Sequence, residues 1–277
     1  MLSISDKSSR MNDFYENMTR RTMLVIGEKA LEILSKTRVI LFGVGGVGGW
    51  CAEGLVRSGL ADLTMVDSDV ICPTNINRQI QATAKNIGAV KVDELGKRLE
   101  EINPSARITP IHAAYDERTC RDFNLGSYDY AVDAIDTLQN KVLLIEQCLA
   151  SRATLFSSMG AASKTDPSKI KIDLLSRTRN CPLARNVRQL LRKKNIAGDF
   201  LCVYSEEMPV GTGYEDVRAP GDYPREPGCE ESFDEQDEAR PDRRGLKKRI
   251  NGSLVHVTGI FGFMLCGLII NDIISSH

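Results

Sequence analysis

The amino-acid sequence predicts an α/β fold: a Rossmann-like, mostly parallel sheet with crossover helices, extended at the C-terminus. Three observations predict it. Short apolar segments alternate with segments of helical spacing over residues 10–160. The first apolar segment runs directly into a glycine cluster at residues 43–49, and acidic residues follow two of the later ones. Because ligands bind beyond the carboxyl ends of parallel strands, these groups are expected along one edge of the sheet.

The expected elements follow one another in regular order. Helical spacing covers residues 14–34, where apolar residues recur on one side. Strands are then expected at residues 38–42, 63–66, 107–113, 128–134 and 154–158. Helices are expected between them, at residues 50–58, 89–102 and 141–151. Such alternation is typical of parallel strands that are joined by crossover helices.

The second half is less regular. A strand is expected at residues 169–175 and a helix at residues 182–194. Residues 211–243 are rich in Pro, Gly, Glu and Asp, which predicts a mobile acidic insertion on the surface. The longest apolar run, residues 254–270, falls just short of the ~20 residues that cross a bilayer. A buried C-terminal helix is therefore expected in preference to a membrane tail, and no stable membrane association is expected.

Composition constrains function only weakly. The 277 residues are 42% hydrophobic and 26% charged, as in ordinary globular proteins. Lys and Arg (36) nearly balance Asp and Glu (37), so overall charge gives no argument for nucleic-acid binding. The eight cysteines form no C-x-x-C pair, which argues against structural zinc and favours reduced thiols in a cytoplasmic protein. Residues 1–12 are polar, unlike a secretory signal.

A glycine pattern marks the expected nucleotide site. Gly43, Gly45 and Gly48 fit G-x-G-x-x-G, and they follow a strand and open a helix, as that motif requires. Glycine lets the backbone approach phosphate closely, and the helix N-terminus offers free N–H groups. Asp67 ends the next strand, where a carboxylate accepts hydrogen bonds from ribose hydroxyls. A tight turn without a ligand is the alternative, and an NAD-dependent dehydrogenase fits these residues equally well.

Charged groups beyond the glycines favour a triphosphate. Arg78 lies in an unusually polar connection, residues 69–79, and its planar fork suits phosphate oxygens. Lys91 opens the next helix and supplies a second cation. Asp136 follows the fourth strand, well placed to hold Mg²⁺ together with phosphate oxygens. Taken singly, each is better explained as a solvated charge. As a set they favour phosphoryl or nucleotidyl transfer, since hydride transfer needs none of them.

Together these residues resemble the ThiF/MoeB and ubiquitin-activating-enzyme superfamily over about residues 10–160. The resemblance implies an ATP-binding domain at residues 10–160, a substrate-binding part at residues 161–277, and adenylation of a carboxylate with ATP and Mg²⁺. It implies catalytic roles for Arg78, Lys91 and Asp136, with Asp136 as the metal ligand. The implied nucleotide-binding residues are Gly43, Gly45, Gly46, Gly48, Asp67, Asp69, Asn75, Arg78, Gln79, Lys91 and Asp133.

The same resemblance implies a homodimer. In the superfamily, an arginine near the N-terminus reaches into the site of the neighbouring subunit. Arg20 or Arg21 of this sequence resembles that residue, and Arg21 is the expected contact to the nucleotide.

The second half is similar to one branch of the superfamily, the tRNA threonylcarbamoyladenosine dehydratases. Residues 171–192 carry this similarity, and residues 203–207 and 252–263 add support. The lack of paired C-x-x-C motifs fits this branch, because members that activate sulfur carriers usually hold zinc with them. Two departures concern the substrate and leave the ATP site intact. Cys181 stands where an aspartate is expected before Pro-Leu-Ala, and the insertion at residues 211–243 is unexpected.

This branch implies a two-step, ATP-dependent dehydration in tRNA. The threonyl carboxylate of threonylcarbamoyladenosine, beside the anticodon, attacks the α-phosphorus of ATP, and pyrophosphate leaves. The ureido group then closes on the activated carbonyl, and AMP leaves, so that a cyclic product forms with net loss of water. Ring closure is intramolecular and has a high effective molarity, so it needs no enzyme thiolate.

Binding of tRNA requires local positive charge. Arg185, Arg188 and Arg192 share one face of the expected helix, and apolar residues occupy the opposite face. The basic run at residues 243–249 extends this character. The three arginines are therefore expected to contact tRNA, with an ordinary amphipathic surface helix as the alternative.

Other functions stay open at this point. An adenylyltransferase that activates the C-terminus of a ubiquitin-like or sulfur-carrier protein would need zinc ligands or an acceptor thiol. Cys181, which follows Arg177 and Arg179, is the available candidate for such a thiol. An NAD-dependent enzyme is disfavoured by Arg78 and Lys91. A non-catalytic scaffold is disfavoured because every expected ATP-site residue is present.

Overall fold

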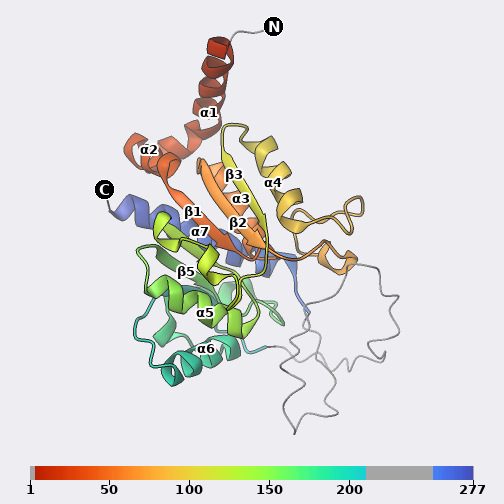
Figure 1. Ribbon diagram of the computed structural model, residues 1–277, viewed down its shortest axis with the longest axis vertical. Coiled ribbons are helices and arrows are strands. Elements are labelled where there is room, and N and C mark those ends of the chain that lie inside the picture. The colour runs from red at the N-terminus through yellow and green to blue at the C-terminus, as the bar shows by residue number, and fades with distance from the viewer. Residues whose placement is uncertain (1–3, 210–251, 277) are drawn as a thin grey trace.

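A seven-stranded, mostly parallel sheet forms the centre of the molecule (Figure 1). The computed structural model describes residues 4–209 and 252–276. Its strands are β1 (Arg38–Phe42), β2 (Asp62–Asp67), β3 (Arg107–His112), β4 (Tyr130–Asp133), β5 (Thr154–Ser158), β6 (Ile170–Leu174) and β7 (Leu201–Ser205). Their order across the sheet is β3-β2-β1-β4-β5-β7-β6, and only β6 pairs antiparallel to its neighbour. The predicted fold class is confirmed.

Helices cover both faces of this sheet (Figure 1). They are α1 (Ile4–Ile26), α2 (Glu28–Lys36), α3 (Gly48–Ser58), α4 (Lys91–Ile102), α5 (Leu138–Leu149), α6 (Pro182–Lys193) and α7 (Val255–Ser275). Val39 and Leu41 of β1 belong to a core shared with α3, α4 and α7. Ile40 and Phe42 belong to a second core, shared with α5 and α6. Alternate residues of a strand point to opposite faces, so β1 is buried on both.

The single helix predicted over residues 14–34 is wrong. Helical backbone ends at Ile26 and resumes at Glu28, because Gly27 adopts φ +83. The break lets α1 turn away from α2 and project from the body of the molecule (Figure 1). Tyr15 fixes α1 to the amino-end side of the sheet, where its hydroxyl donates a 2.7 Å hydrogen bond to the carbonyl of Gly59 after α3.

The other predicted elements are present, and the largest shift in an end is that of α7, which continues to Ser275 beyond the apolar run that ends at residue 270. The sequence pattern did not predict β7. This strand inserts between β5 and β6, with Ser157 opposite Cys202. One continuous sheet therefore crosses the division predicted near residue 160.

The apolar C-terminal segment is a core helix, as predicted. α7 packs against α3, and its Val257, Phe261 and Leu265 are fully buried. By length and composition α7 could also cross a membrane, with mean hydropathy 2.0, but 56% of its most apolar window is buried inside the fold. The predicted acidic insertion at residues 211–243 and the basic run at residues 243–249 lie outside the described residues.

Candidate active site

Two glycines let the loop after β1 fold back on itself. Gly43 has φ +87, and a Cβ built on it would lie 2.8 Å from the carbonyl oxygen of Ala134, just beyond β4. A Cβ on Gly48 would lie 1.8 Å from the carbonyl oxygen of Gly43. Neither position accepts a side chain unless the backbone moves. The loop therefore closes tightly between the ends of β1 and β4, where the strand order of the sheet reverses.

The middle of this loop is open. A Cβ on Gly45 would have no neighbour closer than the side-chain nitrogen of Gln79, at 3.8 Å. α3 starts directly after Val47, and no side chain caps its first turn. The N–H of Gly49 donates to the carbonyl of Gly45 at 3.1 Å, and the other amide groups of the first turn are available to an anion that enters the loop.

The last helix of the chain supports the loop from behind. A Cβ on Gly46 would lie 3.4 Å from Cβ of Thr258 in α7. A Cβ on Gly262 would lie 2.4 Å from the carbonyl oxygen of Val47. α7 and the glycine loop are therefore in backbone contact, although about 200 residues separate them in sequence.

Asp67 ties the end of β2 to the glycine loop. Its two carboxylate oxygens accept hydrogen bonds from the backbone N–H groups of Val44 and Asp69, both at 2.8 Å. Burial raises the pKa of the Asp67 carboxyl above its ordinary value, while the nearby Lys91 ammonium opposes that shift. Each oxygen keeps acceptor capacity, which is what a contact to ribose hydroxyls requires.

Lys91 is a buried cation at the same edge. Its side chain is 7% exposed, and Nζ lies 2.7 Å from Oδ2 of Asp69, whose side chain is 46% exposed. The backbone N–H of Lys91 also donates to the carbonyl of Asp69, at 3.0 Å. This pair fixes the ammonium at the first residue of α4, with its charge offset by a carboxylate that faces solvent.

Arg78 lies over the glycine loop. Its side-chain stem would be 3.2 Å from a Cβ on Gly46. Its Nη1 donates to the carbonyl of Thr74 at 2.8 Å and to Oδ1 of Asn77 at 3.0 Å, and Trp50 Nε1 donates to the Arg78 carbonyl at 3.0 Å. Within the described ranges no carboxylate pairs with this guanidinium. Its other N–H groups are therefore free to bind phosphate oxygens.

Two glutamines and an asparagine form the floor beneath the loop. Asn75, 8% exposed, accepts a 3.1 Å hydrogen bond from the N–H of Cys72. Gln79 is 5% exposed and lies next to Gln81, whose Nε2 donates to the carbonyl of Val44 at 2.7 Å. Oε1 of Gln81 is buried without a hydrogen-bond partner in the structure. Gln81 was not predicted from the sequence, because residues 79–82 form a turn, closed by the N–H of Ala82 on the carbonyl of Gln79 at 3.1 Å, and no residue spacing marks its side chain.

The two carboxylates after β4 differ in their surroundings. Asp133 is fully buried: Oδ2 accepts hydrogen bonds from Lys141 Nζ at 2.7 Å and Ser157 Oγ at 2.6 Å, and Oδ1 accepts one from the N–H of Ile135 at 3.1 Å. These contacts join β4 to α5 and β5. Asp136 is exposed, and its one described partner is the hydroxyl of Thr137 at 3.5 Å. Both were predicted to bind the nucleotide, and only Asp136 faces solvent.

The donor set suits a metal that arrives with phosphate. Over residues 4–209 and 252–276, no group of three His, Cys, Asp or Glu side chains could hold a metal by itself. Mg²⁺ does not need such a cage, because it keeps several waters and is usually held by one or two carboxylates plus substrate phosphates. The exposed Asp136 fits this requirement.

Arg20 and Arg21 lie far from the glycine loop of their own chain. Both are exposed on α1, which packs beside Gly59 at the amino-end side of the sheet. The glycine loop lies at the opposite, carboxyl end of β1. If either arginine contacts nucleotide, the nucleotide must belong to another copy of the chain.

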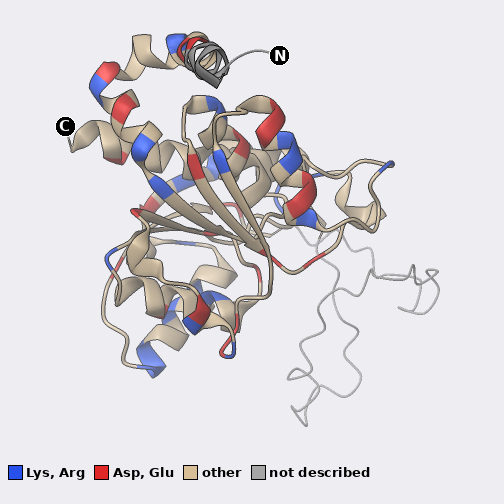
Figure 2. Ribbon diagram, turned by 45° about the horizontal axis from the view of Figure 1, so that its top comes forward, with Lys and Arg blue, Asp and Glu red and all other residues tan. Residues whose placement is uncertain are grey.

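The three arginines predicted to bind tRNA are not equivalent. Figure 2 shows basic residues along α6, where Arg185 and Arg192 are exposed. Arg188 is half-buried instead, and its Nη1 donates to the carbonyls of Leu175 at 3.0 Å and Thr178 at 3.2 Å and to the Thr178 hydroxyl. Arg188 therefore fixes the segment between β6 and α6.

Cys181 is a poor candidate for an acceptor thiol. It precedes α6, is 4% exposed, and its Sγ would lie 3.7 Å from a Cβ on Gly160. The position is buried against the loop after β5, so that a protein substrate would have to displace that loop to reach it.

Known proteins resemble this chain along nearly its whole length. The family model described as "ThiF family" matches residues 19–274. The tRNA threonylcarbamoyladenosine dehydratase of Bacillus subtilis (strain 168) is 40% identical over 198 residues, which are 72% of this chain and 78% of that protein. The Escherichia coli (strain K12) protein of the same name is 33% identical over 207 residues, which are 72% and 77% of the two chains. A crystal structure of the E. coli dehydratase TcdA in complex with ATP superimposes with a TM-score of 0.79 at 27% identity, covering 95% of this chain and 96% of that one.

Proposed function

Because this chain belongs to the ThiF family, we propose that it is an ATP-dependent tRNA threonylcarbamoyladenosine dehydratase. It activates the threonyl carboxylate of threonylcarbamoyladenosine in tRNA by adenylation and then cyclises it. The similarity to the B. subtilis dehydratase carries this proposal. The open glycine loop, covered by Arg78 without an ion pair to a described carboxylate, supports it.

The glycine loop and Asp67 position the ATP. The free amides at the start of α3 bind phosphate oxygens. Asp67 holds the loop through the N–H of Val44 and accepts hydrogen bonds from the ribose. Since Asp67 keeps a fixed place between β2 and the loop, the nucleotide binds to a preformed surface.

Arg78 and Lys91 stabilise charge on the phosphates. When the threonyl carboxylate attacks the α-phosphorus, the new P–O bond forms as the bond to pyrophosphate breaks, and negative charge gathers on the leaving group. The planar guanidinium of Arg78 binds the phosphate oxygens that carry this charge. The buried ammonium of Lys91 binds them too, and it gives up part of its contact with Asp69 to do so.

Asp136 is the residue that would hold Mg²⁺ when the metal binds with the nucleotide. The metal supplies charge neutralisation on the pyrophosphate when it is bound. The Asp133 carboxylate does not contact the phosphates directly, because its oxygens already accept hydrogen bonds from Lys141, Ser157 and the N–H of Ile135. It positions Asp136 through the backbone that joins the two residues.

The second step needs no protein nucleophile. A nitrogen of the ureido group attacks the acyl carbonyl, AMP leaves, and the nitrogen loses its proton. Since both groups sit on one side chain, the attacking group is at high effective molarity. The burial of Cys181 is consistent with this route.

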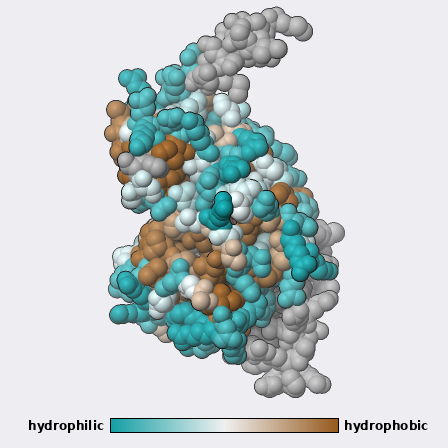
Figure 3. Space-filling view, turned by 60° about the vertical axis from the view of Figure 1, so that its left-hand side comes forward, coloured by the Kyte–Doolittle hydropathy of each residue, from teal (hydrophilic) through white to brown (hydrophobic). Residues whose placement is uncertain are grey.

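The enzyme acts as a cytoplasmic homodimer. Arg21 projects from α1 away from its own glycine loop, and it serves the site of the partner subunit. Four apolar side chains remain exposed on α1 and α7, and the contact between copies would bury them: Leu24, Val25, Phe263 and Ile274. Figure 3 shows an apolar area bordered by hydrophilic residues on one face of the molecule.

Two measurements test the proposed function. In cells that lack this protein, mass spectrometry of tRNA nucleosides should show a loss of the cyclic form relative to open threonylcarbamoyladenosine. An unchanged ratio would contradict the proposal and would favour a protein C-terminus as the substrate instead.

The catalytic assignment is tested in purified protein. Asp136→Ala should abolish tRNA-dependent ATP–pyrophosphate exchange, because the metal loses its protein ligand. As a control, Asp93→Ala removes a different exposed carboxylate, which lies on α4, and this variant should keep the wild-type rate. Wild-type exchange in the Asp136 variant would refute the role of Asp136.

A further inference from the structure

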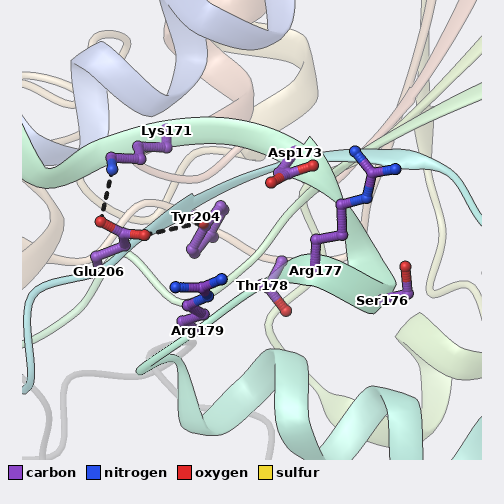
Figure 4. Close-up of a pocket in the computed structure, with 8 residues that line it drawn as sticks. All are labelled: Lys171, Asp173, Ser176, Arg177, Thr178, Arg179, Tyr204 and Glu206. Carbon is purple, nitrogen blue, oxygen red and sulfur yellow. Dashed lines mark hydrogen bonds and ion pairs between the residues drawn. The ribbon is translucent and has the colours of Figure 1, made fainter.

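A pocket of about 530 Å³ opens along the outer edge of the sheet, far from the glycine loop. Its residues come from β6, from β7 and from the segment between β6 and α6. They are Lys171, Asp173, Ser176, Arg177, Thr178, Arg179, Tyr204 and Glu206. Figure 4 shows Arg177 beside Asp173 at one end of the pocket, Lys171 and Glu206 at the other end, and Arg179 below Tyr204 between them.

Three cations (Lys171, Arg177 and Arg179) and two carboxylates (Asp173 and Glu206) line the pocket, which therefore carries a net positive charge. Lys171 Nζ lies 2.6 Å from Oε2 of Glu206, so those two charges offset each other. Lys171, with Arg179 at longer range, holds the pKa of the Glu206 carboxyl below its ordinary value. Arg177 and Arg179 are exposed, and no ion pair to either guanidinium occurs in the part of the chain that the structure describes.

Other contacts hold the backbone beneath these arginines in place. Arg188 donates to the carbonyls of Leu175 and Thr178, on both sides of Arg177. The amide of Asn180 donates to the carbonyl of Glu206 at 3.1 Å, which fixes the chain just after Arg179. A site that must hold a ligand in a set geometry requires such support.

The pocket is close enough to the nucleotide site for one RNA loop to reach both. Four strand spacings separate β6 from β1 in the sheet, or about 19 Å at the usual distance between strands. About six nucleotides of a stacked strand cover that distance, and fewer do so when the strand is splayed. The chain just after Arg179 lies at the end of β7, because the side-chain amide of Asn180 donates to the carbonyl of Glu206 at 3.1 Å.

We propose that this pocket binds a backbone phosphate of the tRNA, a few nucleotides from the modified adenosine, through Arg177 and Arg179. The inference rests on the proposed function and adds the place where the RNA strand is held. Guanidinium forks match phosphate oxygens in bidentate fashion. The one aromatic ring in the lining, Tyr204, is 2% exposed, so the pocket offers no face for stacking a base. It therefore positions the strand without reading its sequence.

The test compares two double variants of the full chain in the presence of Mg·ATP. The probe is a tRNA that carries threonylcarbamoyladenosine, and its Kd is measured at several KCl concentrations. Arg177→Gln with Arg179→Gln should raise Kd at least about tenfold and lower the slope of log Kd against log [KCl] by about 1. ATP affinity measured by calorimetry should stay at the wild-type value. Arg118→Gln with Arg121→Gln, on the connection after the opposite edge strand β3, should leave Kd and slope unchanged.

The outcomes separate this inference from the proposed function. A wild-type protein that neither binds nor cyclises the modified tRNA would refute the function itself. A wild-type protein that does both, with the Arg177 and Arg179 variant equal to it in Kd and slope, would overturn the pocket alone. A variant that keeps its RNA affinity but no longer binds a peptide with a free C-terminal carboxylate would also overturn it, and would assign the pocket to a protein partner.

Discussion

The polar residues at the carboxyl ends of β1, β2 and β4 differ from those at the β6 edge in how they are partnered. At the first region, Asp67, Lys91 and Asp133 are buried or nearly so, and each has a defined partner inside the protein. At the β6 edge, Arg177 and Arg179 are exposed and without an ion-pair partner among the described residues. These three residues of the first region are thus built into the core, whereas the two arginines lie on the surface, so that substitutions in the two sets should have different costs.

The buried pair of Asp133 and Lys141 offers the strongest test of this comparison. Lys141→Met leaves a fully buried carboxylate without its cation, which should lower the free energy of unfolding by about 3–5 kcal/mol. Urea denaturation measures it. Adding Asp133→Asn should recover more than half of the loss, since no buried charge remains. A Lys141 variant as stable as the wild type would show that the first region is not part of the core.

The glycine loop gives the next largest effect. Gly48→Ala places a Cβ where the carbonyl oxygen of Gly43 lies, and we expect it to cost about 3 kcal/mol or more and to abolish ATP binding in calorimetry. Gly45→Ala meets no atom within 3.8 Å and should cost less than about 1 kcal/mol. Equal losses in the two variants would contradict the account of this loop.

Substitutions of two arginines on α6 should give the smallest changes in the free energy of unfolding. Arg188→Gln removes a charged donor from two carbonyls, so it should lower the free energy of unfolding by about 1–2 kcal/mol. Arg185→Gln, on an exposed side chain, should change it by less than about 0.5 kcal/mol. The same two proteins, tested for tRNA affinity, separate a residue that fixes the loop from one that only adds surface charge. An Arg188 variant with wild-type stability would place both in the second class.

Much of the fold was predictable, because hydrophobic periodicity is a local property. β1 and β5 have the bounds that the apolar runs indicate. The break at Gly27 was missed, since the helical pattern of apolar residues continues across it while the backbone does not. β7 was missed although it is as long as β1 and β5, because it lies outside the regular alternation of strands and helices, and its place between β5 and β6 depends on tertiary pairing.

For the candidate site, the sequence indicated the residue types but not their surroundings. Asp133 and Asp136 are equivalent carboxylates in the sequence, but Asp133 alone is buried with three hydrogen-bond donors, from Lys141, Ser157 and the backbone of Ile135. Arg188 shares a helical face with Arg185, yet its guanidinium turns toward carbonyls of a segment that precedes the helix. Such differences depend on tertiary contacts, which the spacing of residues does not encode. The roles assigned to individual site residues stay predictions.

The contact between α7 and the glycine loop has a consequence for biosynthesis. Thr258 and Gly262 reach Gly46 and Val47 only after the ribosome has added the roughly 200 residues that lie between them. A nascent chain that ends before α7 would leave its loop unsupported, and we expect it to have no affinity for nucleotide. Competence for catalysis therefore arrives late and all at once, and incomplete translation products do not sequester ATP.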